Sequence, residues 1–170
     1  SAIDNGTKFK ALDMVPIQGD QTSLYVAELL PYLRAIDPGG DERMVEAIAL
    51  LEGWDGQLDR NSAPAAVVGA WLHHLNRLML LDDLPGPLLD DYLPNDNLQQ
   101  QPRRFLADAL AADASPWCDD TRTADVETCD DLARRALDGA LGDLDARLGG
   151  RAVAWRWGSI HQVRFAHQPL

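Results

Sequence analysis

The sequence predicts a mainly α-helical chain with a short β-strand tail. Along much of residues 1–150, apolar residues recur every three or four positions, which is the spacing of an amphipathic helix. Within residues 151–170 the spacing changes to two, which is typical of strands. The chain has 170 residues, of which 46% are hydrophobic, so it can bury one core. We therefore expect a helical subdomain over residues 1–150 and a β tail over residues 151–170.

The first helix is predicted within TSLYVAELLPYLRAI, residues 22–36. Thr22 or Ser23 can cap its first N–H groups. Pro31 lies inside it and should kink or shorten it. The expected buried stripe consists of Leu24, Ala27, Leu30 and Leu33.

Two more helices follow, separated by a turn. Asp41 can cap the second helix, which Gly53 ends before a turn made of Trp54, Asp55 and Gly56. Ser62 is the expected N-cap of the third helix, with Pro64 in its first turn. Its apolar surface is wide, so we expect it to be central, and its face comprises Val68, Trp71, Leu72, Leu75 and Met79.

The second half of the chain predicts further helices and then the tail. Turns around a short helix are expected in residues 84–96, and a helix around Pro102 in residues 97–113. The clearest helix covers residues 124–148, with Val126 on its apolar face and Gly149-Gly150 as its stop. In the tail, one or two strands are indicated by the alternation of Val153, Trp155, Trp157, Val163 and Phe165.

The charge of the chain excludes some classes of partner. Asp and Glu number 27 against 15 Lys and Arg, so the net charge is −12. Phosphate binding needs clustered cations, so nucleic acid is not an expected partner, and neither is an anionic lipid surface. No apolar run approaches the roughly 20 residues of a membrane helix.

The two cysteines, Cys118 and Cys129, favour a disulfide over two free thiols. They have no CxxC spacing, and His161 and His167 are too distant in sequence to suggest a zinc site. A disulfide indicates an oxidising compartment. Both the disulfide and the pair of free thiols stay open on the sequence alone.

No catalytic, cofactor or metal-binding constellation emerges from the residues. The sequence has no GxSxG, no glycine-rich phosphate loop and no Cys–His nucleophile pattern. Asp55, Asp59 and Asn61 miss the order of a calcium loop. His73 and His74 are neighbours on a helix and point apart, unlike the i, i+4 histidines of a zinc site.

The stretch LLEGWDGQLDRNSAPAAVVGAWLHHL, residues 50–75, resembles a segment of the penicillin amidase family of N-terminal-nucleophile hydrolases. In that family a leucine-rich helix ends at a Trp-Asp-Gly turn, and a Ser-capped, alanine-rich helix with an internal Trp follows. The positions that carry this resemblance are Leu51, Trp54, Asp55, Gly56, Ser62, Ala63, Ala65 and Trp71.

Three further stretches are similar to the family in the same order, so the resemblance covers residues 13–170. One is a Gln-x-Asp-x-x-Ser segment, carried by Gln18, Asp20 and Ser23. The next is the cysteine-containing region WCDDTRTADVETCDDLARRALDGAL. The last is a Trp-Gly-x-x-His segment, carried by Trp157, Gly158, His161, Phe165 and His167.

The resemblance implies a piece of the larger chain of an exported, self-cleaved αββα acylase. In that family the N-terminal serine of the larger chain attacks a linear amide, with its own α-amino group as base. Ser1 is followed by Ala2 rather than the family's Asn, so we do not expect it to be that serine. No family catalytic residue can be placed on a position of this chain.

This reading predicts a scaffold that forms an edge of the acyl pocket and has no activity alone. Its partners would be the smaller chain and the rest of the larger chain, in an extracytoplasmic (periplasmic or secreted) enzyme. The parent's candidate substrates are penicillins, acyl-homoserine lactones and lipopeptides. The alternative is a self-contained helical interaction module. A piece of a larger enzyme should expose an apolar patch around residues 155–165, whereas a module should cover it.

Overall fold

The computed structural model describes residues 8–84, 86–93, 100–112 and 114–162. This part of the chain is mainly helical, which confirms the predicted fold class. In chain order the elements are η1 (Ala11–Asp13), α1 (Met14–Gln18), α2 (Leu24–Arg34), α3 (Glu42–Leu51), α4 (Ala63–Met79), α5 (Gly86–Tyr92), α6 (Gln100–Ala111), η2 (Pro116–Cys118), α7 (Cys129–Leu148), η3 (Ala152–Ala154) and α8 (Trp157–Ile160).

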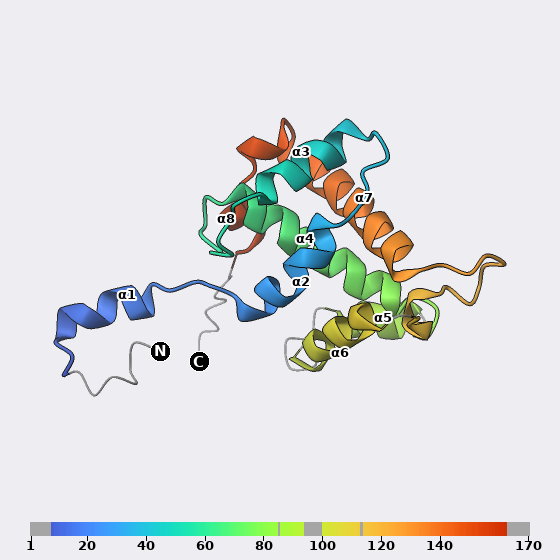
Figure 1. Cartoon of the computed structure of the whole chain (residues 1–170), viewed down its shortest axis with the longest axis horizontal. Helices are drawn as coiled ribbons and strands as arrows, with labels where there is room; N and C mark the ends of the chain where they lie inside the picture. Colours follow the sequence, from blue (N-terminus) through green and yellow to red (C-terminus); the bar gives the residue numbers. More distant parts are fainter. Residues whose placement is uncertain (1–7, 85, 94–99, 113, 163–170) are drawn as a thin grey trace, which may run out of the picture.

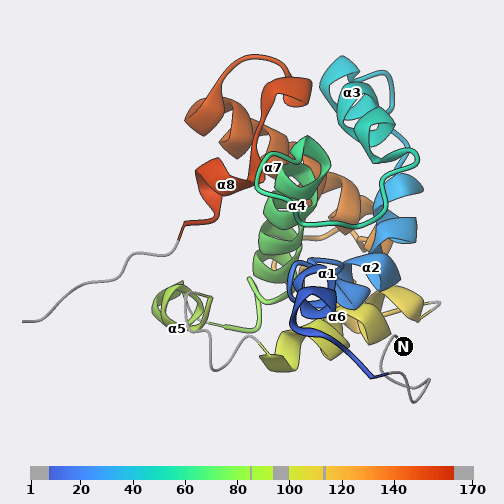
Figure 2. The same cartoon turned by 90° about the vertical axis from the view of Figure 1, so that its left-hand side faces the viewer.

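Helices α4 and α7 pack side by side at the centre of the molecule (Figures 1 and 2). Trp71 of α4 is fully buried, and its indole N–H donates to the carbonyl of Ala133 on α7 at 3.1 Å. The facing side of α7 carries small residues that allow close approach, among them Ala133, Ala136 and Ala140, all buried. The third predicted helix is therefore central, as expected.

Side-chain caps fix where three helices begin. The Ser23 hydroxyl accepts a hydrogen bond from the N–H of Val26 at 3.2 Å, and Asp41 accepts one from the N–H of Arg43 at 2.8 Å. The Ser62 hydroxyl accepts from the N–H of Ala65 at 3.1 Å. Each side chain satisfies an N–H that has no partner within its helix, so these predicted starts are confirmed.

Two details of the predicted helices are wrong. The last long helix begins at Cys129 rather than near residue 124, because Thr128 and Asp131 form a reciprocal capping box there. Val126 consequently lies before the helix and is 84% exposed. In α2 the buried residues are Val26, Leu29, Leu30 and Leu33, whereas Leu24 at its first position is 83% exposed.

The strand predicted over residues 153–157 is also wrong. This segment contains part of η3 and the first residue of α8. Its alternation of large and small side chains therefore does not come from a strand. Trp155 is 5% exposed and donates its indole N–H to the carbonyl of Gly149 at 3.0 Å, while Val153 points to solvent. Because it is buried, Trp155 does not belong to the exposed apolar patch that was expected around residues 155–165. Val163, Phe165 and His167 lie outside the described residues.

The N-terminal segment extends away from the helical body (Figure 1). It contains η1 and α1, and none of the residues of these two elements is buried. Gln18, at the end of α1, is exposed. Among the described helices, none has the length and apolar composition needed to cross a membrane.

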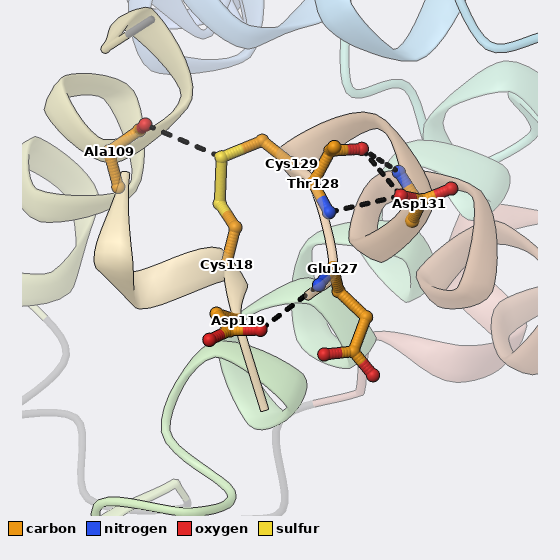
Figure 3. Close-up of a disulfide and its surroundings, with 7 residues drawn as sticks. All are labelled: Ala109, Cys118, Asp119, Glu127, Thr128, Cys129 and Asp131. Carbon is orange, nitrogen blue, oxygen red and sulfur yellow. Dashed lines mark hydrogen bonds between the residues drawn. A yellow bond between two sulfur atoms is a disulfide. The ribbon is translucent and has the colours of Figure 1, made fainter. Parts of the chain in front are cut away.

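A disulfide joins Cys118 at the end of η2 to Cys129 at the start of α7 (Figure 3). Cys118 is buried, with 1% of its surface exposed. Inside the loop that the disulfide closes, Asp119 accepts from the N–H of Glu127 at 3.0 Å, and Glu127 accepts from the N–H of Asp120 at 3.1 Å. The Arg122 side chain lowers the pKa of Asp120 to about 2. The loop is thus held at its base by a covalent bond and crossed by hydrogen bonds.

Replacing both cysteines, as in Cys118→Ser with Cys129→Ser, is expected to lower the free energy of unfolding by about 3 kcal/mol, because the unfolded chain regains loop freedom. Chemical denaturation of the two forms without reductant measures this difference. Thiol titration of the denatured, unreduced protein supplies the control. Two titratable thiols there would contradict the disulfide.

Candidate functional site

Three segments that sequence analysis singled out meet beside the N-terminus of α4. Thr22, before α2, forms an isolated antiparallel bridge with Gln57, just after the Trp-Asp-Gly turn. The N–H of Leu58 donates to the carbonyl of Gln21 at 3.2 Å, and the N–H of Ser23 to that of Gly56 at 3.5 Å. The Gln-x-Asp-x-x-Ser segment and the Trp-Asp-Gly turn are therefore joined directly.

Asp20 and Asp55 play matching roles in this junction. In a bridge of this register, the N–H groups of the two paired residues point outward, away from the partner strand. Asp20 accepts the N–H of Thr22 at 2.9 Å, and Asp55 accepts the N–H of Gln57 at 3.0 Å. Hydrogen bonds from the Thr22 hydroxyl, the Thr22 N–H and the Gln57 amide lower the pKa of Asp20. Both aspartates thus satisfy backbone groups of the bridge.

Arg34 holds the Trp-Asp-Gly turn from the end of α2. Its guanidinium donates to the carbonyl of Leu51 at 3.1 Å and to that of Trp54 at 3.2 Å. The Leu51 carbonyl, at the C-terminus of α3, has no partner within the helix, and the Trp54 carbonyl belongs to the turn. Gly56 adopts φ of 81°, which favours glycine at this position. Sequence reasoning missed Arg34, whose only local signal is a basic residue in a last helical turn.

The Trp-Gly-x-x-His segment docks on the same region from the other end of the chain. The N–H groups of Trp157 and Gly158 donate to the carbonyls of Ser62 and Arg60, at 3.2 and 2.7 Å. A Cβ at Gly158 would lie 3.1 Å from the Arg60 carbonyl oxygen. The loop before α4 and the start of α8 are therefore in contact along their backbones.

Glycine at position 69 makes room for Trp157. A Cβ on Gly69 would lie 2.2 Å from the Trp157 ring, well inside van der Waals contact. The Trp157 ring also stacks on His161, with centroids 4.5 Å apart and planes 10° from parallel. Trp157 thus contacts both α4 and the residue that follows α8.

These segments surround a half-open cleft of about 730 Å³. Its walls include Ser23, Trp157, Gly158 and His161, four of the residues marked by the family resemblance. The resemblance residues Trp54, Asp55 and Gly56 do not line the cleft, although the Gly56 carbonyl accepts the N–H of Ser23, and Trp71 belongs to the core. Gln18 does not line the cleft. The sequence identifies these segments, but only the fold brings them together around one cleft.

Helix α4 contributes the floor of the cleft, including His73 and Asn76. Desolvation lowers the pKa of His73, and the neighbouring His74 and Arg77 lower it further. The next residue, His74, instead faces α7, where its Nε2 lies 2.9 Å from an oxygen of Asp143. In the described part of the chain, His, Cys, Asp and Glu form no group of three or more that could hold a metal ion.

Gly69→Ala is expected to lower the free energy of unfolding by about 1–3 kcal/mol, because the new methyl group overlaps the Trp157 ring. Gly142→Ala is the matched control, since nothing lies within 4 Å of a Cβ there. That control should be stabilising by about 0.5–1 kcal/mol, as expected for Ala over Gly inside a helix. Denaturant unfolding compares the two variants, and equal effects would contradict the contact.

His73 is expected to titrate below the usual value for histidine, about 6.5. Because its pKa is lower in the folded state, the unfolded chain binds the proton more tightly. The stability that neutral His73 contributes is present above about pH 6.5 and is lost as the pH falls through the folded pKa. NMR titration of the ring proton, compared with His73→Gln unfolding at pH 7 and pH 5, checks this. A midpoint above the ordinary value contradicts it.

Comparison with known proteins identifies one family and a set of similarly named relatives. The model of the family described as penicillin amidase matches residues 1–170. The chain is 36% identical over 167 residues to acyl-homoserine lactone acylase QuiP of Pseudomonas aeruginosa, covering 87% of this chain and 19% of that protein. It is 32% identical over 171 residues to QuiP of Pseudomonas putida, covering 89% and 20%.

QuiP of Pseudomonas syringae pv. syringae is 30% identical over 179 residues, which covers 95% of this chain and 21% of that protein. The chain thus spans about a fifth of the length of the curated relatives that it matches. Because the family model matches all 170 residues, the chain belongs to the penicillin amidase family.

Proposed function

We propose that this chain is a helical part of an acylase that hydrolyses linear amides to a carboxylic acid and an amine. The observation that carries the proposal is the match of the penicillin amidase model to residues 1–170. The candidate substrates are penicillins, acyl-homoserine lactones and lipopeptides. The relatives are named as acyl-homoserine lactone acylases, which favours an N-acyl-homoserine lactone.

In this proposal, the bond-breaking residues belong to other parts of the enzyme. The nucleophile is an N-terminal serine whose α-amino group takes the hydroxyl proton as the oxygen attacks the amide carbon. Backbone N–H groups and an asparagine then stabilise the oxyanion. Ser1 is not proposed for this role. The chain alone is therefore expected to be inactive.

We assign this chain the role of scaffold and edge of the acyl pocket. The support is the convergence of Ser23, Trp157, Gly158 and His161 on one cleft against α4. Helices α4 and α7 supply a rigid base, and the bridge between Thr22 and Gln57 fixes the loops above it. The division into a helical subdomain, residues 1–150, and a tail that joins the catalytic sandwich, residues 151–170, is part of the proposal.

The proposed partners are the smaller chain and the rest of the larger chain of the acylase. The proposed location is extracytoplasmic, periplasmic or secreted. The disulfide between Cys118 and Cys129 supports this location, because such bonds persist in oxidising compartments.

The second candidate is a self-contained helical interaction module. The observation that favours it is the burial of Trp155, which a larger enzyme was expected to leave in an exposed patch. The family match argues for an enzymatic parent instead. Activity of the whole protein separates the two candidates.

The full-length protein that carries this chain is expected to release homoserine lactone and the free fatty acid from N-decanoyl-homoserine lactone. Mass spectrometry of the products measures the amide hydrolysis. The 170-residue chain and its Ser1→Ala variant, assayed in parallel, should both be inactive. Turnover by the chain that Ser1→Ala abolishes would overturn the assignment as scaffold. A full-length protein that is inactive on this lactone, on a penicillin and on a lipopeptide would overturn the acylase assignment.

A further inference from the structure

We propose that a small hollow between α4, α7 and α8 binds a short-chain organic carboxylate, with the anionic head at Arg147 and the hydrocarbon body against Leu144 and Ile160. The hollow adjoins the larger cleft and is distinct from it. The link between this ligand and the acid that amide hydrolysis releases rests on the proposed function, whereas the site itself does not.

The size of the hollow sets the size of its ligand. It has a volume of about 210 Å³ and lies where the three helices meet (Figure 2). Sites for drug-sized ligands have volumes of roughly 300–1,000 Å³, so this one suits a smaller molecule. At about 30 Å³ for each water molecule of the liquid, there is room for about seven, which is close to the number of non-hydrogen atoms in hexanoate.

Arg147 supplies a positive charge that no carboxylate in the described part of the chain neutralises. Asp143 stands one turn before Arg147 on α7, a spacing at which two such side chains can pair. Its carboxylate instead lies 2.9 Å from Nε2 of His74 on α4, and Arg147 makes no salt bridge among the described residues. A guanidinium without a partner can bind a carboxylate through two parallel N–H bonds.

The guanidinium of Arg147 reaches toward α4, on the opposite side of the hollow. Burial lowers the pKa of His73, and the charges of His74, Arg77 and Arg147 lower it further. Because Arg147 stands on α7 and His73 on α4, its charge acts on the ring across the space between the two helices. Neutral His73 keeps one ring N–H, which can donate to the same carboxylate.

The rest of the lining suits a hydrocarbon body. Leu144 is buried, and Ala70, Ile160 and the Trp157 ring are the other large apolar parts of the lining. An inorganic anion would leave these side chains facing water, whereas the chain of a short acid would cover them. The combination of one unpaired arginine with apolar walls therefore favours a monocarboxylate over phosphate or sulfate.

The position of the hollow connects it with the proposed reaction. Gly69, His73 and Trp157 line both the hollow and the larger cleft, for which the edge of the acyl pocket is proposed. Hydrolysis of a linear amide releases a carboxylic acid. A short acid in the hollow would therefore lie against the same tryptophan and the same helix as the acyl pocket, as a product held beside it.

Crystals of the full-length protein soaked in ω-bromohexanoate test the site directly. The anomalous signal of the bromine is expected beside Leu144 and Ile160, with the carboxylate bonded to Arg147. A hollow without bromine, a carboxylate placed away from Arg147, or a hollow filled by another segment of the protein would overturn the inference.

Fluorine NMR with ω,ω,ω-trifluorohexanoate measures binding to the full-length protein in solution. Arg147→Gln is expected to weaken binding about tenfold, because the head loses its charged partner. Arg104→Gln removes an exposed arginine of α6 outside the hollow and is the matched control, which should leave binding unchanged. Acid bound at the reacting centre is common to both variants, so their difference reports the hollow. Equal affinities of the two variants would overturn the role of Arg147.

Neither experiment depends on turnover. A full-length protein that binds the acid in the hollow but hydrolyses no amide would count against the proposed function alone. One that hydrolyses amides while the hollow stays empty would count against this inference alone.

Discussion

The packing of α4 on α7 is the contact on which the rest of the structure depends. Trp71 fills the interface and donates to the Ala133 carbonyl, and the small residues of α7 let the two helices approach closely. Gly139 extends this close fit, since a Cβ there would lie 2.7 Å from the His74 ring. With α4 fixed in this way, its N-terminus and its cleft-facing side are fixed too.

The loops and the C-terminal segment use α4 as a common support. The loop before α4 accepts the backbone N–H groups of Trp157 and Gly158, and Gly69 accommodates the Trp157 ring. Arg34 ties the end of α3 to α2, so the Trp-Asp-Gly turn cannot shift independently. Among the residues marked by the family resemblance, the side chains of Asp20, Ser23, Asp55, Ser62 and Trp71 bond to backbone groups and so form part of the framework.

Local chemistry explains which parts of the fold could be predicted from the sequence. The caps at Ser23, Asp41 and Ser62 depend on residues three positions away or nearer, so the sequence contains all the information needed. The tail could not be predicted in this way. Trp155 is buried because it packs back on the core and donates to the Gly149 carbonyl. Its spacing from the neighbouring apolar residues resembles that of a strand, although the segment is not one.

In the candidate site, too, local features could be predicted from the sequence, whereas contacts between distant segments could not. The sequence marked Ser23, Trp157 and His161, but not the cleft that they line, because their meeting depends on packing between distant segments. Asn76 and Arg60 carry no sequence signal of their own. The Asn76 oxygen is buried without a donor, and Arg60 lines a cleft whose described lining contains no Asp or Glu, and both facts depend on the fold.

The bridge between Thr22 and Gln57 has a consequence for how the molecule meets other copies of itself. Short extended segments with free outward N–H groups can recruit further strands and so start aggregation. Here Asp20 and Asp55 occupy those N–H groups and place a negative charge on each outer side. The outward N–H groups are already bonded, and an incoming strand would also approach a carboxylate. Pairing therefore stops at two segments, which protects the protein from aggregation during folding.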